Sequence, residues 1–179
     1  MKIVIVGCGR VGAVLAEQFD AAGHDVVVID LSSLAFDRLS GEFRGQAIRG
    51  DGTDEDTLRR AGAKGADVFL ALTEGDNRNV MAAQVAAESL EIEKVIAKIN
   101  DPVRAAAYAE LGIATVCRTT MLSDAISAFL GFEQSGIPSI IAAVGHHHDR
   151  PGGAATDAAG RDPGRFAAPA AQPTGQGRA

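Results

Sequence analysis

Short apolar segments alternate with helical patterns over the first 118 residues of this chain, and this alternation constrains its fold more than any other feature. The apolar segments are continuous runs, which is typical of strands that are covered on both faces of a parallel sheet. The segments predicted as strands are 2–6, 25–30, 46–50, 66–73, 94–99 and 113–117. The helical patterns between them cover 10–22, 33–41, 54–61, 76–90 and 101–111. Residues 1–118 are therefore predicted to form an α/β domain with a doubly wound parallel sheet of six strands.

The first predicted strand runs directly into a glycine-rich loop. Residues 7–12 read GCGRVG, a G-x-G-x-x-G pattern that follows a strand and opens a helix. In dinucleotide-binding folds, Gly7 would permit the tight turn, Gly9 would let the backbone approach a pyrophosphate, and Gly12 would allow close packing of helix and strand. The free N–H groups at the start of the helix favour a phosphate. We therefore expect a Rossmann-like domain that holds a nucleotide at this loop.

An acidic residue closes the second predicted strand, VVVID. Asp30 lies 18 positions after Gly12, where a carboxylate can accept hydrogen bonds from both hydroxyls of a ribose. The same negative charge repels a 2′-phosphate, which favours NAD over NADP. Arg10, inside the glycine loop, could bind a phosphate through two parallel hydrogen bonds or could face solvent at the start of the helix.

Polar residues also follow the third and fourth predicted strands. Asp51, Gly52 and Thr53 come after the third strand, where they are placed to meet the adenine edge of a nucleotide. Turn formation and helix capping are the alternative for the two polar side chains, and both roles could coexist. Three further candidates come after the fourth strand, near the point where the strand order reverses: Thr73, Asp76 and Asn79. These side chains would either contact the far half of a dinucleotide or cap the following helix.

Composition and charge exclude several other classes of protein. A net charge of −6 does not suit general nucleic-acid binding, because proteins that bind the phosphate backbone usually carry a basic face. No apolar run approaches the roughly 18 residues that would cross a bilayer, and the N-terminus has no pattern of a secretion signal. We therefore expect a protein that is not secreted and does not insert into a membrane. Cys8 and Cys117 would lie three strands apart, roughly 14 Å, which is too far for a disulfide.

The sequence predicts a nucleotide cradle without a recognisable catalytic apparatus. A dehydrogenase needs a second domain or long loops, and a general acid/base near the carbon that accepts the hydride. His24 lies in a short turn, the other three histidines lie beyond residue 145, and Tyr108 is the only tyrosine. This pattern favours a sensor over an enzyme, with an NAD-dependent oxidoreductase as the alternative.

Two more helical patterns follow the sixth predicted strand, within residues 119–145. Apolar residues recur with helical spacing at 122, 125, 126, 129 and 130, and again at 137, 140, 141 and 144. We expect these helices to extend past the finished sheet and to pair with a second copy of the chain, unless they fold back on the same sheet. Residues 146–179 are mostly Ala, Gly and Pro and are predicted to be a disordered tail, with His146–His148 as an incidental cluster.

Several segments together resemble the RCK (KTN) domain, the regulator of potassium conductance found in Trk and Ktr potassium-uptake regulators. The likeness runs from Met1 to about Leu130 and is carried by MKIVIVGCGRVGAVLAEQF, VVVID, GDGTDEDTLRRAG, ADVFLALTEGDNRNVMAAQVA and VIAKINDP. The resemblance implies a cytoplasmic gating subunit, peripheral to the inner face of the cell membrane, that binds NAD(H) or ATP/ADP. It also implies dimers, paired through helices after the sixth strand, that assemble into a ring beneath a membrane potassium transporter.

The resemblance assigns roles to individual residues as well. Arg10 matches the arginine of the glycine loop that contacts the terminal phosphates in ATP-responsive members. Lys98 stands where many members have an arginine after the fifth strand, so the charge is kept while bidentate contacts are lost. The complete set of predicted cofactor-binding residues is Gly7, Cys8, Gly9, Arg10, Val11, Gly12, Asp30, Leu31, Asp51, Gly52, Thr53, Thr73, Asp76, Asn79 and Lys98.

We therefore expect a nucleotide-sensing regulatory subunit of a Trk-type potassium transporter. Family regulators usually continue into a second small α/β lobe, whereas this chain passes into the region rich in Ala, Gly and Pro. A truncated regulator, a single-lobe partner of a full-length subunit and a decayed, inert nucleotide binder are the alternatives. The expected assembly is correspondingly either a homo-oligomer built from dimers or a hetero-oligomer with a full-length regulator.

Overall fold

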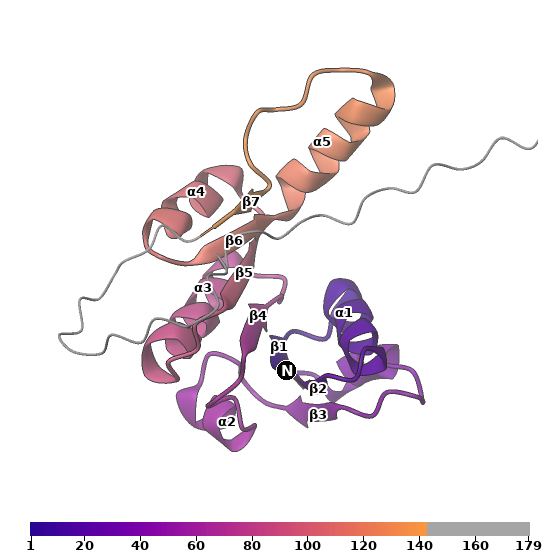
Figure 1. The fold of residues 1–179 in the computed structure, drawn as a ribbon, viewed down its shortest axis with the longest axis vertical. Coiled ribbons are helices and arrows are strands. Elements are labelled where there is room, and N and C mark those ends of the chain that lie inside the picture. The colour runs from indigo at the N-terminus through magenta and orange to yellow at the C-terminus, as the bar shows by residue number, and fades with distance from the viewer. Residues whose placement is uncertain (143–179) are drawn as a thin grey trace, which may run out of the picture. The chain divides into compact units, whose positions relative to one another are not determined.

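The computed structural model describes residues 1–142, and one sheet of seven strands forms the centre of that region (Figure 1). The strands are β1 (Lys2–Val6), β2 (Asp25–Asp30), β3 (Gln46–Arg49), β4 (Val68–Ala71), β5 (Val95–Ile99), β6 (Ala114–Cys117) and β7 (Ile140–Ile141). Their order across the sheet is β3-β2-β1-β4-β5-β6-β7. The first six strands are parallel, which confirms the predicted Rossmann-like, doubly wound topology. The strand order reverses between β1 and β4.

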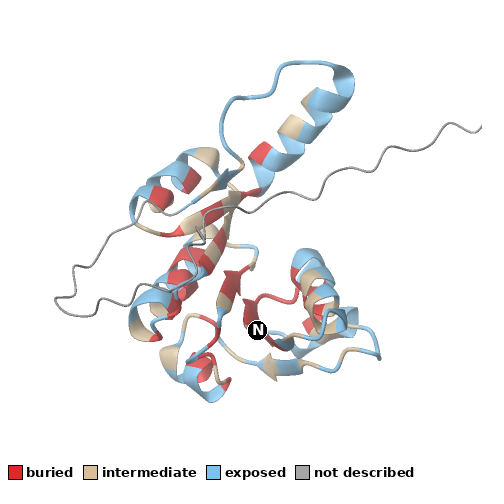
Figure 2. Cartoon of the chain, in the orientation of Figure 1, coloured by how far each residue is buried: buried red, intermediate tan, exposed pale blue. Residues whose placement is uncertain are grey.

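Helices cover both faces of the sheet. They are α1 (Arg10–Ala21), the 3-10 helix η1 (Ser33–Arg38), α2 (Glu55–Arg60), α3 (Asp76–Gln84), the π-helical turn η2 (Val85–Ser89), α4 (Pro102–Glu110) and α5 (Arg118–Leu130). Alternate residues of β1 enter two separate apolar clusters: Ile3 and Ile5 join residues of α1, whereas Val4 and Val6 join residues of α2, α3 and α4. The strands therefore hold most of the largest fully buried side chains, and the central strands are correspondingly red in Figure 2. This two-sided burial explains the continuous apolar runs of the sequence.

Two of the predicted helices differ in detail from the observed ones. The helix expected over 33–41 is the short η1, and the helix expected over 76–90 changes from α3 to the π-helical η2 after Gln84. The predicted strand 66–73 is shorter at both ends, and its last two residues, Leu72 and Thr73, line a cavity at the carboxyl ends of the strands.

The prediction of a helix around Ile137–Val144 is wrong within the described residues. Residues 132–139 form no helix, and Ile140–Ile141 form β7, which pairs antiparallel with β6. The N–H of Cys117 donates to the carbonyl oxygen of Ser139 at 2.7 Å. Isoleucine is stiff at its branched β-carbon and favours strands, and the exposed edge of β6 offers unpaired backbone groups. The sheet therefore has a seventh, antiparallel strand that the apolar spacing did not predict.

The helix predicted directly after the sixth strand is confirmed as α5. It begins at Arg118 and ends at Leu130, and the following Gly131 adopts the left-handed conformation with φ of +75°. Thr120 is the only buried residue along α5, whereas Phe129 is 90% exposed. The apolar face of α5 is therefore left uncovered by residues 1–142.

Both cysteines are free and buried, as expected from their positions in the sheet. Burial raises the pKa of the Cys8 thiol, and the nearby Asp30 carboxylate raises it further, so this thiol is protonated at neutral pH. The predicted disordered tail and His146–His148 lie outside the described residues. Among residues 1–142, no helix is both long and apolar enough to cross a membrane.

Candidate functional site

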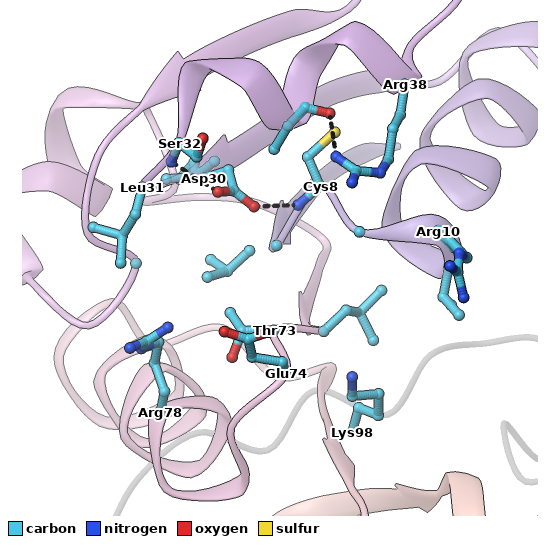
Figure 3. Close-up of a pocket in the computed structure, with 18 of the residues that line it drawn as sticks. Cys8, Arg10, Asp30, Leu31, Ser32, Arg38, Thr73, Glu74, Arg78 and Lys98 are labelled. Carbon is cyan, nitrogen blue, oxygen red and sulfur yellow. Dashed lines mark hydrogen bonds between the residues drawn. The ribbon is translucent and has the colours of Figure 1, made fainter.

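The carboxyl ends of the parallel strands open into a cavity of about 640 Å³ (Figure 3). Parallel α/β sheets bind ligands at this edge, because the loops diverge where the strand order reverses. The glycine loop after β1, the end of β2, η1, and the loops after β3 and β4 line the cavity. Lys98 of β5 and Arg118, the first residue of α5, complete the lining.

Close backbone contacts account for two of the three loop glycines. Gly7 has φ of +104°, and a Cβ at this position would lie 2.8 Å from the backbone nitrogen of Thr73. A Cβ on Gly12 would collide with the carbonyl oxygen of Gly7. A Cβ on Gly9 would meet no atom within 4 Å. The packing of the loop therefore requires Gly7 and Gly12, whereas the space beside Gly9 is open.

The N-terminus of α1 is uncapped at this loop. Gly9 occupies the N-cap position without a side chain, and the first turn of α1 contains no acidic residue. Asp54 and Asp101, in contrast, cap α2 and α4 through their carboxylates. The first N–H groups of α1 and the positive end of its dipole are therefore free to attract an anion.

Asp30 ties the end of β2 to the glycine loop. Its Oδ2 atom accepts a hydrogen bond from the N–H of Cys8 at 2.8 Å, and Oδ1 accepts one from the N–H of Ser32 at 2.9 Å (Figure 3). Each carboxylate oxygen keeps further acceptor capacity, so ribose hydroxyls could still donate to it. Asp30 therefore positions the loop in addition to lining the cavity.

Cationic side chains outnumber carboxylates around the cavity, although the whole chain has a net charge of −6. The cations are Arg10, Arg38, Arg78, Lys98 and Arg118, and the acids are Asp30, Asp51 and Glu74. Arg38 donates to the carbonyl oxygen of Ala35 at 3.3 Å. Within residues 1–142 the other four cations form no side-chain hydrogen bond or salt bridge. Such a cluster raises the local concentration of anions and can bind phosphates through charge-assisted hydrogen bonds.

Lys98 is the cation most affected by its surroundings. Burial lowers the pKa of its ammonium group and the adjacent Arg118 lowers it further, whereas Asp76 and Glu74 act in the opposite direction. Holding this charge at a partly buried position beside Arg118 therefore destabilises the folded protein. An anion between Lys98 and Arg118 would relieve both the desolvation and the repulsion.

Most of the predicted cofactor-binding residues line this cavity. They are Gly7, Cys8, Gly9, Arg10, Val11, Asp30, Leu31, Asp51, Gly52, Thr73 and Lys98. Four others do not line it: Gly12, Thr53, Asp76 and Asn79. Gly12 packs against the loop, and Asn79 is buried beneath Thr73 and Lys98, to whose backbones it is hydrogen-bonded.

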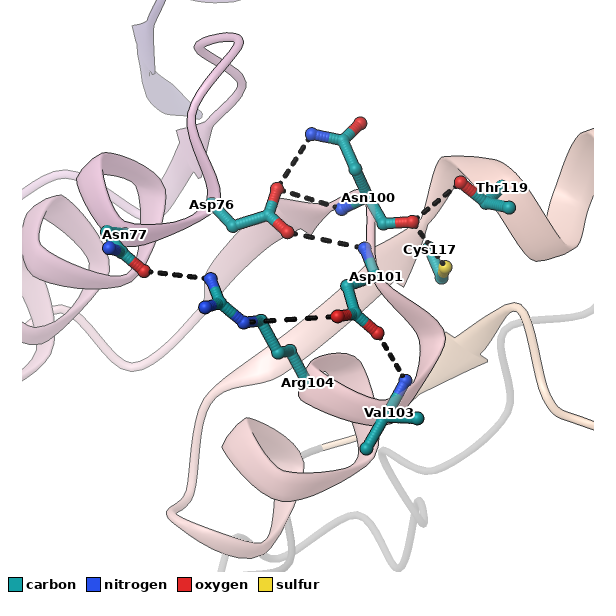
Figure 4. A network of polar contacts seen from close by, with 8 residues as sticks. All are labelled: Asp76, Asn77, Asn100, Asp101, Val103, Arg104, Cys117 and Thr119. Atoms are coloured by element: carbon teal, nitrogen blue, oxygen red, sulfur yellow. Dashed lines mark hydrogen bonds and ion pairs between the residues drawn. The ribbon is translucent and has the colours of Figure 1, made fainter.

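Asp76 organises the loop after β5 instead of contacting the cavity (Figure 4). Its Oδ1 atom accepts hydrogen bonds from the backbone N–H of Asn100 at 2.9 Å and from Nδ2 of the same residue at 2.7 Å. The carbonyl oxygen of Asn100 in turn accepts a 2.6 Å hydrogen bond from the hydroxyl of Thr119. Asp76 therefore links the start of α3 to the first turn of α5.

The residues after β3 combine local structure with a place at the cavity. Asp51 accepts hydrogen bonds from the N–H and the hydroxyl of Thr53 at 2.9 and 2.8 Å, so the predicted turn is present. A Cβ on Gly52 would collide with the side chain of Val6, which explains the glycine by packing. Thr53 lines a second cavity of about 650 Å³, which shares Glu74 and Arg78 with the first.

The sequence reasoning missed several residues that line the cavity: Ser32, Leu34, Arg38, Glu74, Arg78 and Arg118. Arg118 could have been found, because it directly follows the sixth strand and therefore stands at the same edge of the sheet as Asp30. Arg78 lies between the predicted site residues Asp76 and Asn79, but the direction of its side chain depends on where α3 starts.

We predict that Gly12→Ala destabilises the protein, whereas Gly9→Ala does not. The added methyl at residue 12 collides with the carbonyl oxygen of Gly7, and overpacking of this kind costs about 1–3 kcal/mol. The methyl at residue 9 enters open space. Chemical denaturation of both variants would measure the free energies of unfolding. Equal stability of the two variants would contradict the packing assigned to the loop.

We also predict that Lys98→Met raises the thermal stability of the ligand-free protein at pH 7. The unfolded chain binds more protons than the folded chain between the lowered pKa of Lys98 and its ordinary value of 10.5. The penalty is therefore complete below the folded-state pKa and fades as the pH rises through this interval. Calorimetry should show a higher Tm for Lys98→Met at pH 7 and a smaller difference as the pH approaches 10.5. Lys64→Met, at an exposed position, is the control, and an equal gain there would contradict the cause given.

Comparisons with known proteins agree with this fold and its glycine loop. The Trk system potassium uptake protein TrkA of Streptomyces coelicolor is 48% identical over 124 residues, which cover 69% of this chain and 56% of that protein. The TrkA-N domain of the inner membrane protein YbaL from Escherichia coli superimposes with a TM-score of 0.64 at 24% identity, covering 72% of this chain and 96% of that domain. The Kef CTD of Shewanella denitrificans in AMP-bound form gives a TM-score of 0.60 at 23% identity, covering 73% and 82%.

The chain spans about half the length of the curated relatives that it matches. The family match itself covers residues 3–119 and is described as the TrkA-N domain. It includes the glycine loop, Asp30 and the six parallel strands, and it confirms the resemblance to the N-terminal domain of Trk-type regulators. The chain therefore belongs to the TrkA-N domain family.

Proposed function

We propose that this protein is a nucleotide-sensing regulatory subunit of a Trk-type potassium uptake transporter. The observation that carries the proposal is the cavity of about 640 Å³ at the glycine loop, lined by four cations that have no side-chain partner among residues 1–142 and by the uncapped N-terminus of α1. A ligand with phosphate groups would neutralise this charge. The role in potassium transport is supported by the family, since the TrkA proteins that match the chain are named for potassium uptake.

The ligand that the cavity fits best is NAD(H) or ATP/ADP. We place the adenosine half near Asp30 and Asp51, and the phosphates at the N-terminus of α1. Asp30 disfavours a 2′-phosphate by its charge. Arg10, Lys98 and Arg118 would then meet either the terminal phosphates of ATP or the far half of NAD(H). The AMP-bound Kef CTD supports an adenine nucleotide in a domain of this fold.

Nucleotide occupancy would act on α5, because the cavity includes the first residue of that helix. Arg118 lines the cavity, and the apolar face of α5 lies along the following turns. A ligand that binds one arrangement of α5 more tightly than another shifts the population towards it, whereas equal affinity for both shifts nothing. The size of the regulatory effect would therefore equal the ligand's difference in affinity between the two arrangements.

A thermal-shift titration with NADH, NAD⁺, ADP and ATP tests the binding proposal. A ligand that binds only the folded chain stabilises it by about 2.7 kcal/mol when its concentration is 100 times its Kd, which corresponds to a Tm increase of several degrees. Asp30→Ala should weaken NAD(H) binding roughly ten-fold or more in calorimetry, because the ribose loses its acceptor. If none of the four nucleotides changed the Tm, the proposal would be wrong.

We further propose that two copies of the chain pair through α5, directly or within a hetero-oligomer with a full-length regulator. Its exposed apolar residues are Met121, Leu122, Ile126, Phe129 and Leu130. An uncovered apolar face of this kind is typical of a protein–protein interface. The paired subunits would lie in the cytoplasm against the membrane potassium transporter, arranged as a ring.

The double substitution Phe129→Asp with Leu130→Asp should shift the protein towards the monomer. Charges on the apolar face of α5 would be buried without partners in a dimer, which is costly. Sedimentation velocity of the whole chain measures the change. Val103→Asp on α4 is a matched control, because Val103 is also exposed but lies on a different helix. An oligomer that is unaffected by the double substitution would rule out α5 as the interface.

An NAD-dependent oxidoreductase is the rival hypothesis for the same cavity. His24, the one histidine among residues 1–142, lies before β2 at the opposite end of the strands from the cavity and packs near Phe19. A hydride-transfer assay over a panel of small substrates separates the two functions, since sustained turnover would favour the enzyme. Co-purification with the potassium transporter would argue against an inert remnant.

A further inference from the structure

Asn79 is a polar residue beneath the cavity whose hydrogen-bonding groups are all occupied. Its side chain is fully buried. Oδ1 accepts hydrogen bonds from the N–H of Thr73 at 2.8 Å and from the hydroxyl of Thr73 at 2.7 Å. Nδ2 donates to the carbonyl oxygens of Thr73 at 3.0 Å and of Lys98 at 2.7 Å. Four hydrogen bonds are the full capacity of an amide, so Asn79 has no group left for a ligand.

The position of Asn79 in the sheet explains these contacts. The pairing of β4 with β5 ends at Ala71 and Ala97. Beyond this point the segment after β4 no longer pairs with β5, although Leu72 still donates to the carbonyl oxygen of Val6, and β5 continues to Ile99. The side-chain amide of Asn79, on α3, bridges the two separated segments, as a backbone peptide group would in a continuous sheet. Without this bridge, the backbone N–H and carbonyl groups of Thr73 and the carbonyl group of Lys98 would lose these hydrogen bonds.

We propose that Asn79 is a positioning residue of the nucleotide cavity, which bridges Thr73 to Lys98 and so fixes Lys98 relative to the glycine loop. The bridge reaches the loop because Gly7 packs directly against the backbone of Thr73. Thr73 and Lys98 both line the cavity, on either side of the bridge. A phosphate held by the loop therefore meets Lys98 at a set distance. This inference rests on the proposed nucleotide-binding function.

Asn79 also determines whether the hydroxyl of Thr73 donates or accepts hydrogen bonds. Because Oδ1 of Asn79 can only accept, the hydroxyl of Thr73 must donate its proton to it. Thr73 can then offer only lone pairs to a ligand. It therefore favours a hydrogen-bond donor, such as a ribose hydroxyl, and disfavours a phosphate oxygen. Asn79 thus directs phosphate towards Lys98 and away from Thr73.

A double-mutant cycle on the whole chain tests the inference, with ADP and adenosine as calorimetric probes. Asn79→Ala should weaken ADP binding roughly 10-fold, the scale of one charge-assisted hydrogen bond, and should change adenosine binding much less. In a Lys98→Met background the same substitution should have little further effect on ADP, because it acts through Lys98. Asn77→Ala, an exposed position on the same helix, is the matched control.

The proposal would be overturned if Asn79→Ala weakened the binding of ADP and adenosine equally. It would also be overturned if the substitution weakened ADP binding equally in the unmodified and the Lys98→Met protein, because a purely structural role predicts these results. If Asn79→Ala does not fold, Asn79→Asp is the second variant for the same test. It keeps the acceptor for Thr73 and, when ionised, lacks the donor for Lys98. Its ADP affinity should therefore fall more steeply with rising pH than that of the unmodified protein, and parallel pH profiles would contradict the bridge.

A ligand-free measurement separates failure of this inference from failure of the proposed function. In an NMR titration, the lowered pKa of Lys98 should move towards its ordinary value in Asn79→Ala, because the released strand can turn the ammonium group towards solvent. The charged groups that face Lys98 (Arg118, Asp76 and Glu74) are the same in both proteins. If the unmodified protein binds neither probe, nucleotide sensing fails, and an unchanged Lys98 titration then overturns the positioning role as well.

Discussion

The close approach of three backbone segments at the glycine loop is the constraint on which the rest of the site depends. Gly12 lies against the carbonyl oxygen of Gly7, and Gly7 lies against the backbone of Thr73. No side chain fits at either contact, so α1 can start directly at the end of β1 and beside the loop after β4. The carboxylate of Asp30 then fixes the loop from the third side through the N–H of Cys8. These contacts place the uncapped end of α1 over the cavity.

The gathering of positive charge around the cavity lowers the stability of the fold. Five cations line it without a salt bridge among the described residues, and the pKa of Lys98 is lowered by burial and by Arg118. Because these cations form no salt bridge with the carboxylates around them, their charge is available to an anionic ligand. This is the arrangement expected of a binding site, where groups suited to a ligand are destabilising in its absence.

The cavity and α5 are joined by short connections. Arg118 lines the cavity and begins α5, while Thr119 donates a 2.6 Å hydrogen bond to Asn100, which Asp76 holds in place (Figure 4). A change around Arg118 is therefore adjacent to the anchored first turn of a helix that carries an uncovered apolar face. This proximity is a physical basis for linking the proposed nucleotide binding to the proposed pairing of two copies, because both would involve α5.

The sequence by itself determined the six parallel strands, the glycine loop and the acid at the end of β2, because these depend on continuous apolar runs and on local spacing. It could not determine that Ile140–Ile141 extend the sheet, since a helical spacing of isoleucines and an exposed strand edge compete, and only the edge of β6 decides between them. Nor could it separate Thr73, which faces the cavity, from Asn79, which is buried beneath it. That difference arises where β4 leaves β5, and only the tertiary structure brings these distant backbone groups together around one amide.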